Sequence, residues 1–272
     1  METQANKLQE LVGAASANEH SHTKFIAITS GKGGVGKSLV SSIIAQYLNQ
    51  KNYTTICGDT DPVNSTFHQI KGLGVALVPI TEGGTVIQRL FDPLFESIIT
   101  AESPVVIDNG ASTFLPMLKF LKSNSILDTL EQFGKQTYIH TIITGGQAKD
   151  DTANGLLSLI DMVKESGTKA KIVVWQNDFW GKPLFDGKPL EDMPWIKKNS
   201  DIIQGIITII DRNSDAFSTD IKIMTENHMT LNEVKQSEEF GLLAKSRIHR
   251  VFNDIYMQLD SIFDSENSEA HG

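Results

Sequence analysis

Cysteine is almost absent from this chain, since Cys57 is the single one among 272 residues. One cysteine cannot form an intramolecular disulfide or a Cys-x-x-Cys metal site, so disulfide scaffolds and cysteine-bound clusters within one chain are excluded. Cys57 lies in an apolar stretch, and we interpret it as a small buried core residue.

Long apolar runs and a surplus of positive charge are also lacking. No stretch of about 18 apolar residues is present, and residues 1–23 lack the charged-then-apolar order of a signal peptide. We therefore expect no membrane association and a cytoplasmic location. The net charge of −9 argues against a protein that binds nucleic acid over most of its surface. Direct DNA binding would need a local basic patch, and the sequence leaves it open.

The length and composition suit one large α/β domain. The chain is 40% hydrophobic and 21% charged, which is ordinary for a globular protein with a full core. We assign residues 24–263 to this domain. Residues 1–23 are polar and are interpreted as a flexible N-terminal segment, and residues 264–272 as an acidic C-terminal tail.

The strongest motif lies in residues 24–50. FIAITS predicts a buried strand, GKGGVGKS a glycine-rich loop, and LVSSIIAQYLNQ a helix. This is the P-loop pattern, in which loop N–H groups and the helix N-terminus bind phosphate oxygens. It predicts that Lys37 contacts the β and γ phosphates and that Ser38 ligates Mg²⁺. The candidate nucleotide-binding residues are Gly31, Gly33, Gly34, Val35, Gly36, Lys37, Ser38 and Leu39.

Acidic residues follow two further predicted strands. Asp59 and Asp61 come after YTTICG, and Asp108 comes after PVVI. Ligands of doubly wound sheets bind at the carboxyl ends of the strands, so these carboxylates are expected near the phosphates. Asp108 fits a Walker B acid that holds Mg²⁺. Taken alone, the Asp59–Asn64 stretch is also typical of a turn.

KGGVGKS, residues 32–38, resembles the deviant Walker A motif of the ParA/MinD superfamily of dimerising ATPases. The resemblance implies that Lys32 reaches across a nucleotide-sandwich dimer to the phosphates of the partner. DTDPVN resembles the switch I segment of that family. This implies that Asp61 positions the attacking water, and that Asp59 supports the lysine and the Mg²⁺ shell. Asn177 matches the asparagine that hydrogen-bonds the adenine ring.

Residues 108–112, DNGAS, depart from the DxPP or DxxPS continuation that is usual for switch II of the superfamily. With the following TFLP they resemble a plasmid-borne subgroup, the TraL and StbB proteins of conjugative plasmids. The resemblance implies a role in conjugal transfer or in plasmid positioning and stable inheritance. Switch II couples the nucleotide state to a partner, so the departure leaves the identity of the partner open.

The rest of the chain alternates between strand and helix patterns. The segment 179–195, with two Gly-Lys-Pro triplets, predicts an excursion that either forms a partner surface or folds over the base site. His140 is interpreted as a structural histidine. The final helix turns acidic, so we expect it to pack on the core rather than bind lipid. We expect strands at 75–80, 136–144, 171–177 and 202–210, and helices at 85–100, 125–133, 151–163, 216–224 and 240–263.

These patterns predict a doubly wound, mainly parallel sheet flanked by helices, a P-loop NTPase fold of the ParA/MinD type. The favoured hypothesis is a nucleotide-switched ATPase that forms a homodimer with ATP and Mg²⁺ and meets a plasmid transfer or segregation protein. Alternatives are a metabolic P-loop ligase of the dethiobiotin synthetase type, or a nucleotide-binding scaffold without hydrolysis. The catalytic candidates are Lys32, Lys37 and Asp61, and the metal candidates are Ser38, Asp59 and Asp108.

Overall fold

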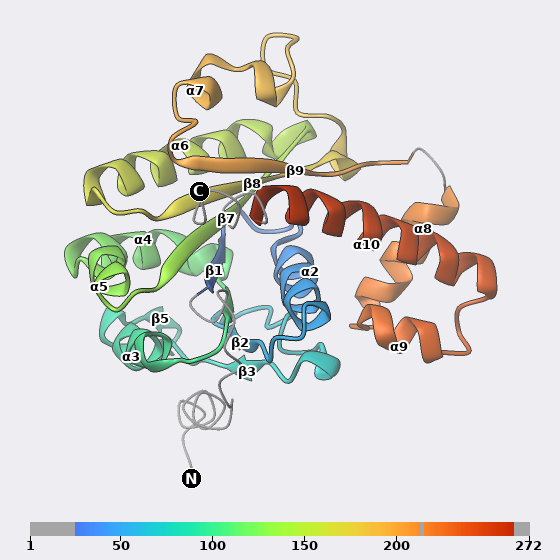
Figure 1. Ribbon diagram of the computed structural model, residues 1–272, viewed down its shortest axis with the longest axis horizontal. Coiled ribbons are helices and arrows are strands. Elements are labelled where there is room, and N and C mark those ends of the chain that lie inside the picture. Colours follow the sequence, from blue (N-terminus) through green and yellow to red (C-terminus); the bar gives the residue numbers. More distant parts are fainter. Residues whose placement is uncertain (1–24, 213–214, 264–272) are drawn as a thin grey trace, which may run out of the picture.

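A seven-stranded sheet forms the centre of the molecule in the computed structural model, which describes residues 25–212 and 215–263 (Figure 1). Every neighbouring pair of its strands is parallel. The strand order is β3-β2-β6-β1-β7-β8-β9. The strands are β1 Phe25–Ser30, β2 Ile56–Asp59, β3 Ala76–Leu77, β6 Val105–Asp108, β7 Gln136–Thr144, β8 Lys171–Asn177 and β9 Ile203–Ile209. The predicted doubly wound parallel sheet is confirmed.

The order of the strands reverses on the two sides of β1, which pairs with β6 on one side and β7 on the other. In such sheets the connections diverge at this point and leave a crevice at the carboxyl ends of the strands. The register brings Asp108 level with Thr29 on one neighbour and with Asp59 on the other. The loop after β1 and both acids therefore meet at one edge.

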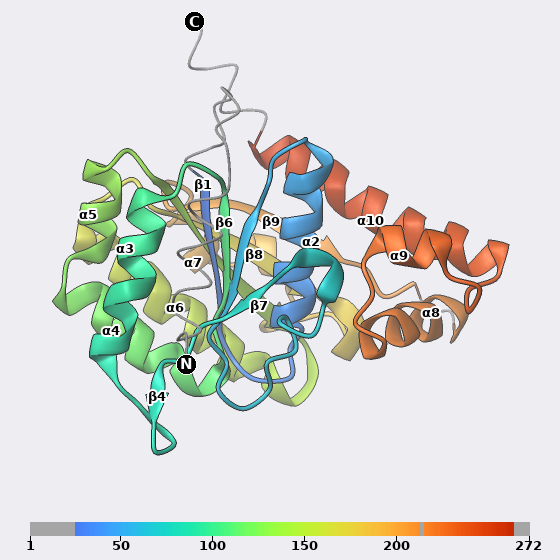
Figure 2. The same cartoon turned by 90° about the horizontal axis from the view of Figure 1, so that it is seen from below.

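Helices cover both faces of the sheet (Figures 1 and 2). One buried apolar cluster lies on the side of α3 to α6, and a second lies under α2 and α8 to α10. The strands of a sheet that is covered on both sides are apolar almost throughout, as VVID and KIVVWQN are here. The helices are α2 Lys37–Gln50, α3 Asp92–Thr100, α4 Phe114–Ser123, α5 Ile126–Gln132, α6 Lys149–Ser166, α7 Pro194–Lys197, α8 Asp215–Glu226, α9 Leu231–Gln236 and α10 Leu242–Phe263.

The helix expected at 85–100 is wrong in its first half. The chain there forms a hairpin of β4 Thr81–Glu82 and β5 Thr85–Val86, then the short 3-10 turn Gln88–Phe91, and α3 begins only at Asp92. Gly83 and Gly84 both have positive φ, which a two-residue hairpin turn of the primed type requires. The Gly-Gly pair was therefore the better signal than the helical spacing of the apolar residues.

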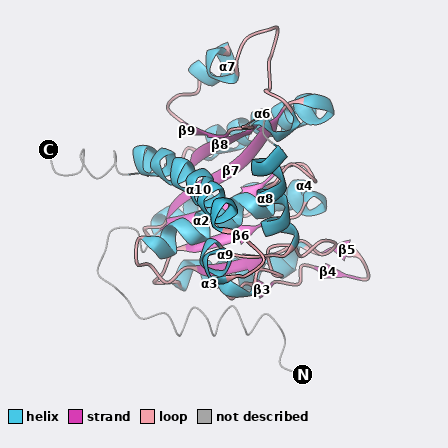
Figure 3. Cartoon of the chain, turned by 90° about the vertical axis from the view of Figure 1, so that its right-hand side faces the viewer, coloured by secondary structure: helices cyan, strands magenta, loops and turns pink. Residues whose placement is uncertain are grey.

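The excursion between β8 and β9 extends away from the sheet and carries α7 (Figure 3). It consists of short 3-10 turns, one antiparallel bridge between Phe185 and Lys188, and α7, as the glycine and proline content predicted. The last helix packs Ile248, Phe252 and Leu259 into the second core, so its interpretation as a core helix is confirmed. Across 25–212 and 215–263, no helix has the length and apolar character to cross a membrane. The segments 1–23 and 264–272 lie outside the described residues.

Candidate functional site

The glycine-rich loop ends in the helix that the motif predicted. Gly36 is the N-cap of α2 and has a left-handed backbone with φ of 105°. A β-carbon at this position would also lie 3.2 Å from Nδ2 of Asn177, so both backbone and space favour glycine. The free N–H groups of the α2 N-terminus thus point toward the loop, which is how helices bind anions.

A cavity of about 370 Å³ lies beside this loop, and we call it the P-loop cavity. It brings the loop together with Asp61 from the segment after β2 and with Ala111 from the segment after β6. Its far wall comes from the end of α8 and the following turn. The P-loop residues that line it are Gly33, Gly34, Gly36, Lys37, Ser38 and Leu39, and the far wall is made of Met224, Thr225, His228 and Met229.

Lys37 is the buried cation of the P-loop cavity. Its Nζ donates a hydrogen bond to the backbone oxygen of Lys32 at 2.9 Å, which closes the loop around the ammonium group. Burial lowers the pKa of Lys37, and the nearby carboxylates of Asp108, Asp61 and Asp59 oppose that shift. A charged ammonium surrounded by loop N–H groups is suited to phosphate oxygens.

Asp108 is held under the loop by two hydroxyl groups. Ser38 Oγ donates to Oδ2 at 2.6 Å and Ser41 Oγ donates to Oδ1 at 3.1 Å. Burial raises the pKa of Asp108 to about 7, although the hydrogen bond from Ser38 works in the opposite direction. The register of the parallel strands explains why two residues 70 positions apart meet here.

Replacing Asp108 with asparagine is expected to stabilise the nucleotide-free protein above neutral pH. Because the folded-state pKa rises from 3.8 to about 7, the folded state binds the proton more tightly and stability falls as pH rises through this window. The asparagine side chain does not titrate, so its stability advantage over the wild type should be larger at pH 8 than at pH 5, by roughly 1–3 kcal/mol. Urea unfolding at both pH values measures this, with the exposed Glu191→Gln as control. An equal difference at both pH values would contradict it.

The segment after β2 contains the turn that the sequence suggested, and it places Asp61 beside the loop. Asp59 accepts the N–H groups of Asp61 and His68, each at 2.9 Å, one on each carboxylate oxygen. Asp61 accepts the N–H groups of Val63 and Asn64 at 2.9 and 3.1 Å, an Asx turn. Asp61 also lines the P-loop cavity. Asp59 therefore shapes the segment, while Asp61 is half-buried beside the loop.

Lys32 points away from the P-loop cavity, although it belongs to the same loop. Its Nζ forms an ion pair with Asp151 in the first turn of α6, and 43% of its side chain is exposed. The two lysines of the loop thus differ in environment, since Lys37 is buried and Lys32 faces solvent. An exposed ion pair of this kind contributes about 0–1 kcal/mol, so Lys32 can leave it at little cost.

Asn177 lines a second, mostly apolar cavity of about 360 Å³ on the other side of the loop. Its Nδ2 donates to the backbone oxygen of Val35 at 3.0 Å, and its Oδ1 accepts the N–H of Phe179 at 3.1 Å. Phe179 and Trp180 line this cavity and are about half exposed. The start of the 179–195 excursion therefore lies beside Asn177 in the wall of this cavity.

The two remaining residues that the sequence singled out are structural. His140 is buried in β7, where its Nδ1 accepts a hydrogen bond from Trp175 Nε1 at 2.9 Å. Burial lowers the pKa of His140 to about 3, so the ring is neutral. Cys57 is buried in the second core, as predicted.

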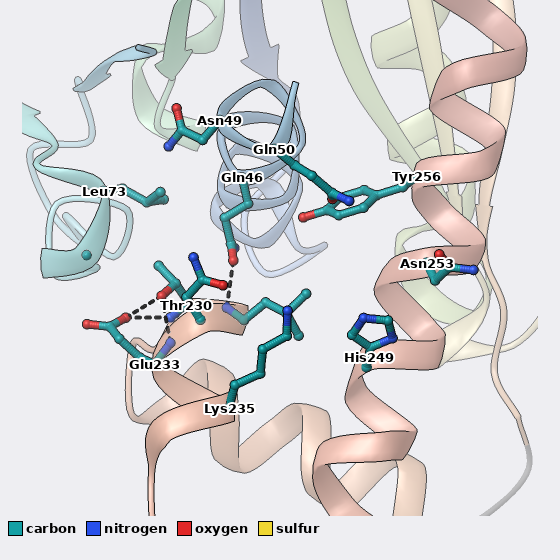
Figure 4. A pocket seen from close by; sticks show the side chains of 13 residues that line it. Gln46, Asn49, Gln50, Leu73, Thr230, Glu233, Lys235, His249, Asn253 and Tyr256 are labelled. Carbon is teal, nitrogen blue, oxygen red and sulfur yellow. Dashed lines mark hydrogen bonds between the residues drawn. The ribbon is translucent and has the colours of Figure 1, made fainter. Parts of the chain in front are cut away.

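A third cavity, of about 440 Å³, lies at the opposite end of α2 from the loop (Figure 4). It is formed by α2, α9 and α10 together with the turn around Leu73, and most of its rim is polar. Gln46 points from α2 into this region, and its Oε1 accepts the N–H of Leu231 at the start of α9 at 2.6 Å. It has no P-loop residue in its walls, so we keep it separate from the candidate site.

Several residues of the site carry no sequence signal that points to it. Asp151 pairs with Lys32 of the loop, although 119 residues separate the two in the sequence. His228 comes from the turn between α8 and α9 and lines the P-loop cavity. A local signal does exist for α9, because Thr230 and Glu233 form the capping box that Thr-x-x-Glu predicts. The capping box could have predicted where α9 begins. It could not have predicted that the turn before α9 lies against the P-loop cavity.

Residues 26–255 match the CobQ/CobB/MinD/ParA nucleotide binding domain. Over 238 residues, the chain is 37% identical to one Escherichia coli protein TraL and 34% identical to another, which covers 88% of this chain and 98% of each relative. The MinD cell division protein of Aquifex aeolicus has a similar fold. The two chains are 15% identical in sequence and superpose with a TM-score of 0.47, and the match covers 88% of this chain and 97% of the MinD chain.

Proposed function

This chain belongs to the CobQ/CobB/MinD/ParA family of nucleotide-binding domains, and we propose that it is an ATPase that uses ATP binding and hydrolysis as a switch. One observation carries the proposal. Lys37, Ser38 and Asp61, from two separate segments, line one cavity beside a phosphate-binding loop, with Asp108 bonded to Ser38 beneath it. A positively charged loop with a carboxylate in the wall of the same cavity suits a triphosphate and an attacking water.

The residues beneath the loop suit Mg²⁺. Mg²⁺ prefers a few oxygen ligands and keeps several waters, and Ser38 and Asp108 offer a hydroxyl and a carboxylate that already contact each other. Asp59 would support this shell from the neighbouring strand. In the part of the chain that the structure describes, no three His, Cys, Asp or Glu side chains gather into a preformed metal site. The metal would therefore depend on the nucleotide, whose phosphate oxygens it neutralises when bound.

The protein would act mainly by placement and charge. Lys37 binds the phosphate chain, the loop N–H groups from Gly33 to Leu39 cradle it, and Asp61 orients the attacking water. Asn177 lies beside the apolar cavity, where it would contact the base, provided that it exchanges its bond with Val35. We assign Lys32 to the partner subunit's phosphates in an ATP-bound homodimer, because it is exposed at the edge of the loop.

The resemblance of residues 108–116 to plasmid proteins, together with the similarity to TraL, supports a role in conjugal transfer or plasmid inheritance. Hydrolysis would be slow and stimulated by a transfer or segregation protein that reads the segments after β2 and β6. Val63 and Leu115 lie in these segments and are exposed at 72% and 70%, so both segments present apolar side chains to a partner.

Replacing Lys32 with alanine is expected to abolish dimerisation in ATP and Mg²⁺ while monomer binding of the nucleotide stays within about threefold. The side chain is exposed and pairs only weakly with Asp151, so its loss should leave the fold and the phosphate cradle intact. Light scattering with a non-hydrolysable ATP analogue measures the dimer, and phosphate release without any added acceptor measures hydrolysis.

Lys198→Ala removes an exposed lysine at the end of α7 and serves as the control. It should dimerise as the wild type does. Undiminished dimerisation of the Lys32 variant would overturn the sandwich arrangement. Phosphate release that depends strictly on a small-molecule acceptor would favour a metabolic ligase instead.

A further inference from the structure

His228 lies in the wall of the P-loop cavity opposite the loop, in the turn that follows α8. Its backbone is left-handed, with φ of 51°. The N–H of Met229 bonds to Met224 at 3.0 Å and the N–H of His228 to Thr225 at 3.1 Å, which is the Schellman arrangement of a helix C-terminus. Glycine is the preferred residue at this position, because a side chain there is strained. Histidine at this position therefore costs stability.

The side chain adds a second unfavourable feature. Nδ1 of His228 is buried and has no hydrogen-bond partner among the residues that the structure describes. A buried polar atom without a partner is destabilising. His228 nevertheless lines the same cavity as Lys37 and Ser38. His228 thus carries both an unfavourable backbone conformation and an unpartnered buried nitrogen, and it lines a candidate ligand cavity. Such destabilising features in a binding cavity point to a functional role for the residue.

The turn that carries His228 is held in a fixed position relative to the loop. The N–H of Leu231 donates to Oε1 of Gln46 in α2 (Figure 4), and Nε2 of Gln46 donates to Oγ of Ser42 at 2.9 Å. Ser42 is itself part of the P-loop cavity wall. The capping box of Thr230 and Glu233 fixes the chain from the other side. The turn that carries His228 is thus tied by hydrogen bonds to α2, the helix that follows the P-loop.

We propose that His228 donates a hydrogen bond from its imidazole to a phosphate oxygen of the bound nucleoside triphosphate. This inference rests on the proposed function, because it takes the P-loop cavity as the phosphate site. The contact connects the phosphate chain to α8 and α9, so the nucleotide bridges the P-loop and the C-terminal helices. The phosphate contact would then explain why a histidine occupies a position where the backbone favours glycine.

The test is His228→Gly, measured by calorimetric titration with a non-hydrolysable ATP analogue and by thermal unfolding of the nucleotide-free protein. Glycine relieves the backbone and removes the unpartnered nitrogen, so the variant should melt at the same temperature as the wild type or higher. Its affinity for the analogue should fall about 10-fold, as expected for one lost hydrogen bond to a charged group. His228→Asn tolerates the same backbone and keeps a donor, so it should recover part of the affinity.

His249→Ala, an exposed residue of α10 that lines the third cavity and not the P-loop cavity, is the matched control and should change neither quantity. An affinity of His228→Gly within twofold of the wild type would overturn the contact, and so would a lower melting temperature with unchanged affinity. Lys37→Ala separates this inference from the proposed function. If Lys37→Ala loses binding while His228→Gly keeps it, only the histidine contact fails, and if both bind as the wild type does, the phosphate site itself is wrong.

Discussion

Replacing Lys37 with alanine is expected to weaken binding of ATP by at least about 100-fold, the largest loss that we expect from any single side chain. Hydrogen bonds to charged groups contribute about 1.5–3 kcal/mol each, and an ammonium at the phosphate chain makes more than one of them. The variant also loses the bond from Lys37 Nζ to the Lys32 oxygen, so the loop is less well ordered for the phosphates. Calorimetric titration with a non-hydrolysable ATP analogue measures this loss.

The control for Lys37→Ala lies within the same loop. Lys32→Ala removes the exposed lysine and should leave the affinity of the monomer nearly unchanged. The Lys37 variant should remain folded by circular dichroism, since removal of the ammonium can be compensated by proton uptake at Asp108, whose pKa is already raised to about 7. Equal losses in the two variants would mean that the loop contributes general charge rather than a specific phosphate contact.

Replacing Gly110 with alanine is expected to lower ATP turnover by roughly 100-fold while the affinity stays within about threefold, because a small misplacement of a reacting group costs about that much. The backbone of Gly110 has φ of −61° and ψ of 157°, which any residue adopts, so only space matters. An added β-carbon would lie 2.6 Å from Cγ and 2.9 Å from Cα of Asp61. Because the clash involves the backbone, Asp61 must move, whereas Lys37 and Ser38 need not.

Phosphate release in saturating ATP and Mg²⁺ measures the effect, and titration with the analogue checks the affinity. Gly155→Ala is the matched control, because Gly155 lies inside α6 with nothing within 4 Å of an added β-carbon. That variant should turn over normally and be slightly more stable, as alanine favours helices. Normal turnover of Gly110→Ala would mean that the contact between the segments after β2 and β6 does not position the water.

The sheet and the P-loop could be predicted from the sequence because their signals are local. β1, the loop and α2 follow one another without interruption, and the apolar runs of VVID and KIVVWQN are typical of buried parallel strands. The sequence also predicted that Asp59 and Asp108 lie at the carboxyl edge of the sheet, and the observed register pairs them there. Sequence reasoning was wrong where two local signals competed, as at Gly83-Gly84, where hairpin chemistry overrode helical spacing.

The walls of the site could not be predicted, because they depend on which distant segments pack together. Asp151 and His228 are ordinary helix-end residues in the sequence, and only the packing of α6 and α8 against the loop gives them a position. The bond from Leu231 to Gln46 joins residues 185 positions apart. Residue spacing in the sequence does not predict a contact between such distant residues. The phosphate loop could be predicted because all its residues are consecutive, GKGGVGKS.

The far wall of the P-loop cavity has a consequence for biogenesis. His228 leaves the ribosome about 190 residues after Lys37, which at 5–20 residues per second is a delay of roughly 10–40 s. During that interval the cradle is open on one side, and α10, which packs on α8 and β9, is still missing. On the proposed function, a nascent chain would lack the phosphate contact from His228 until this wall of the cavity has been made.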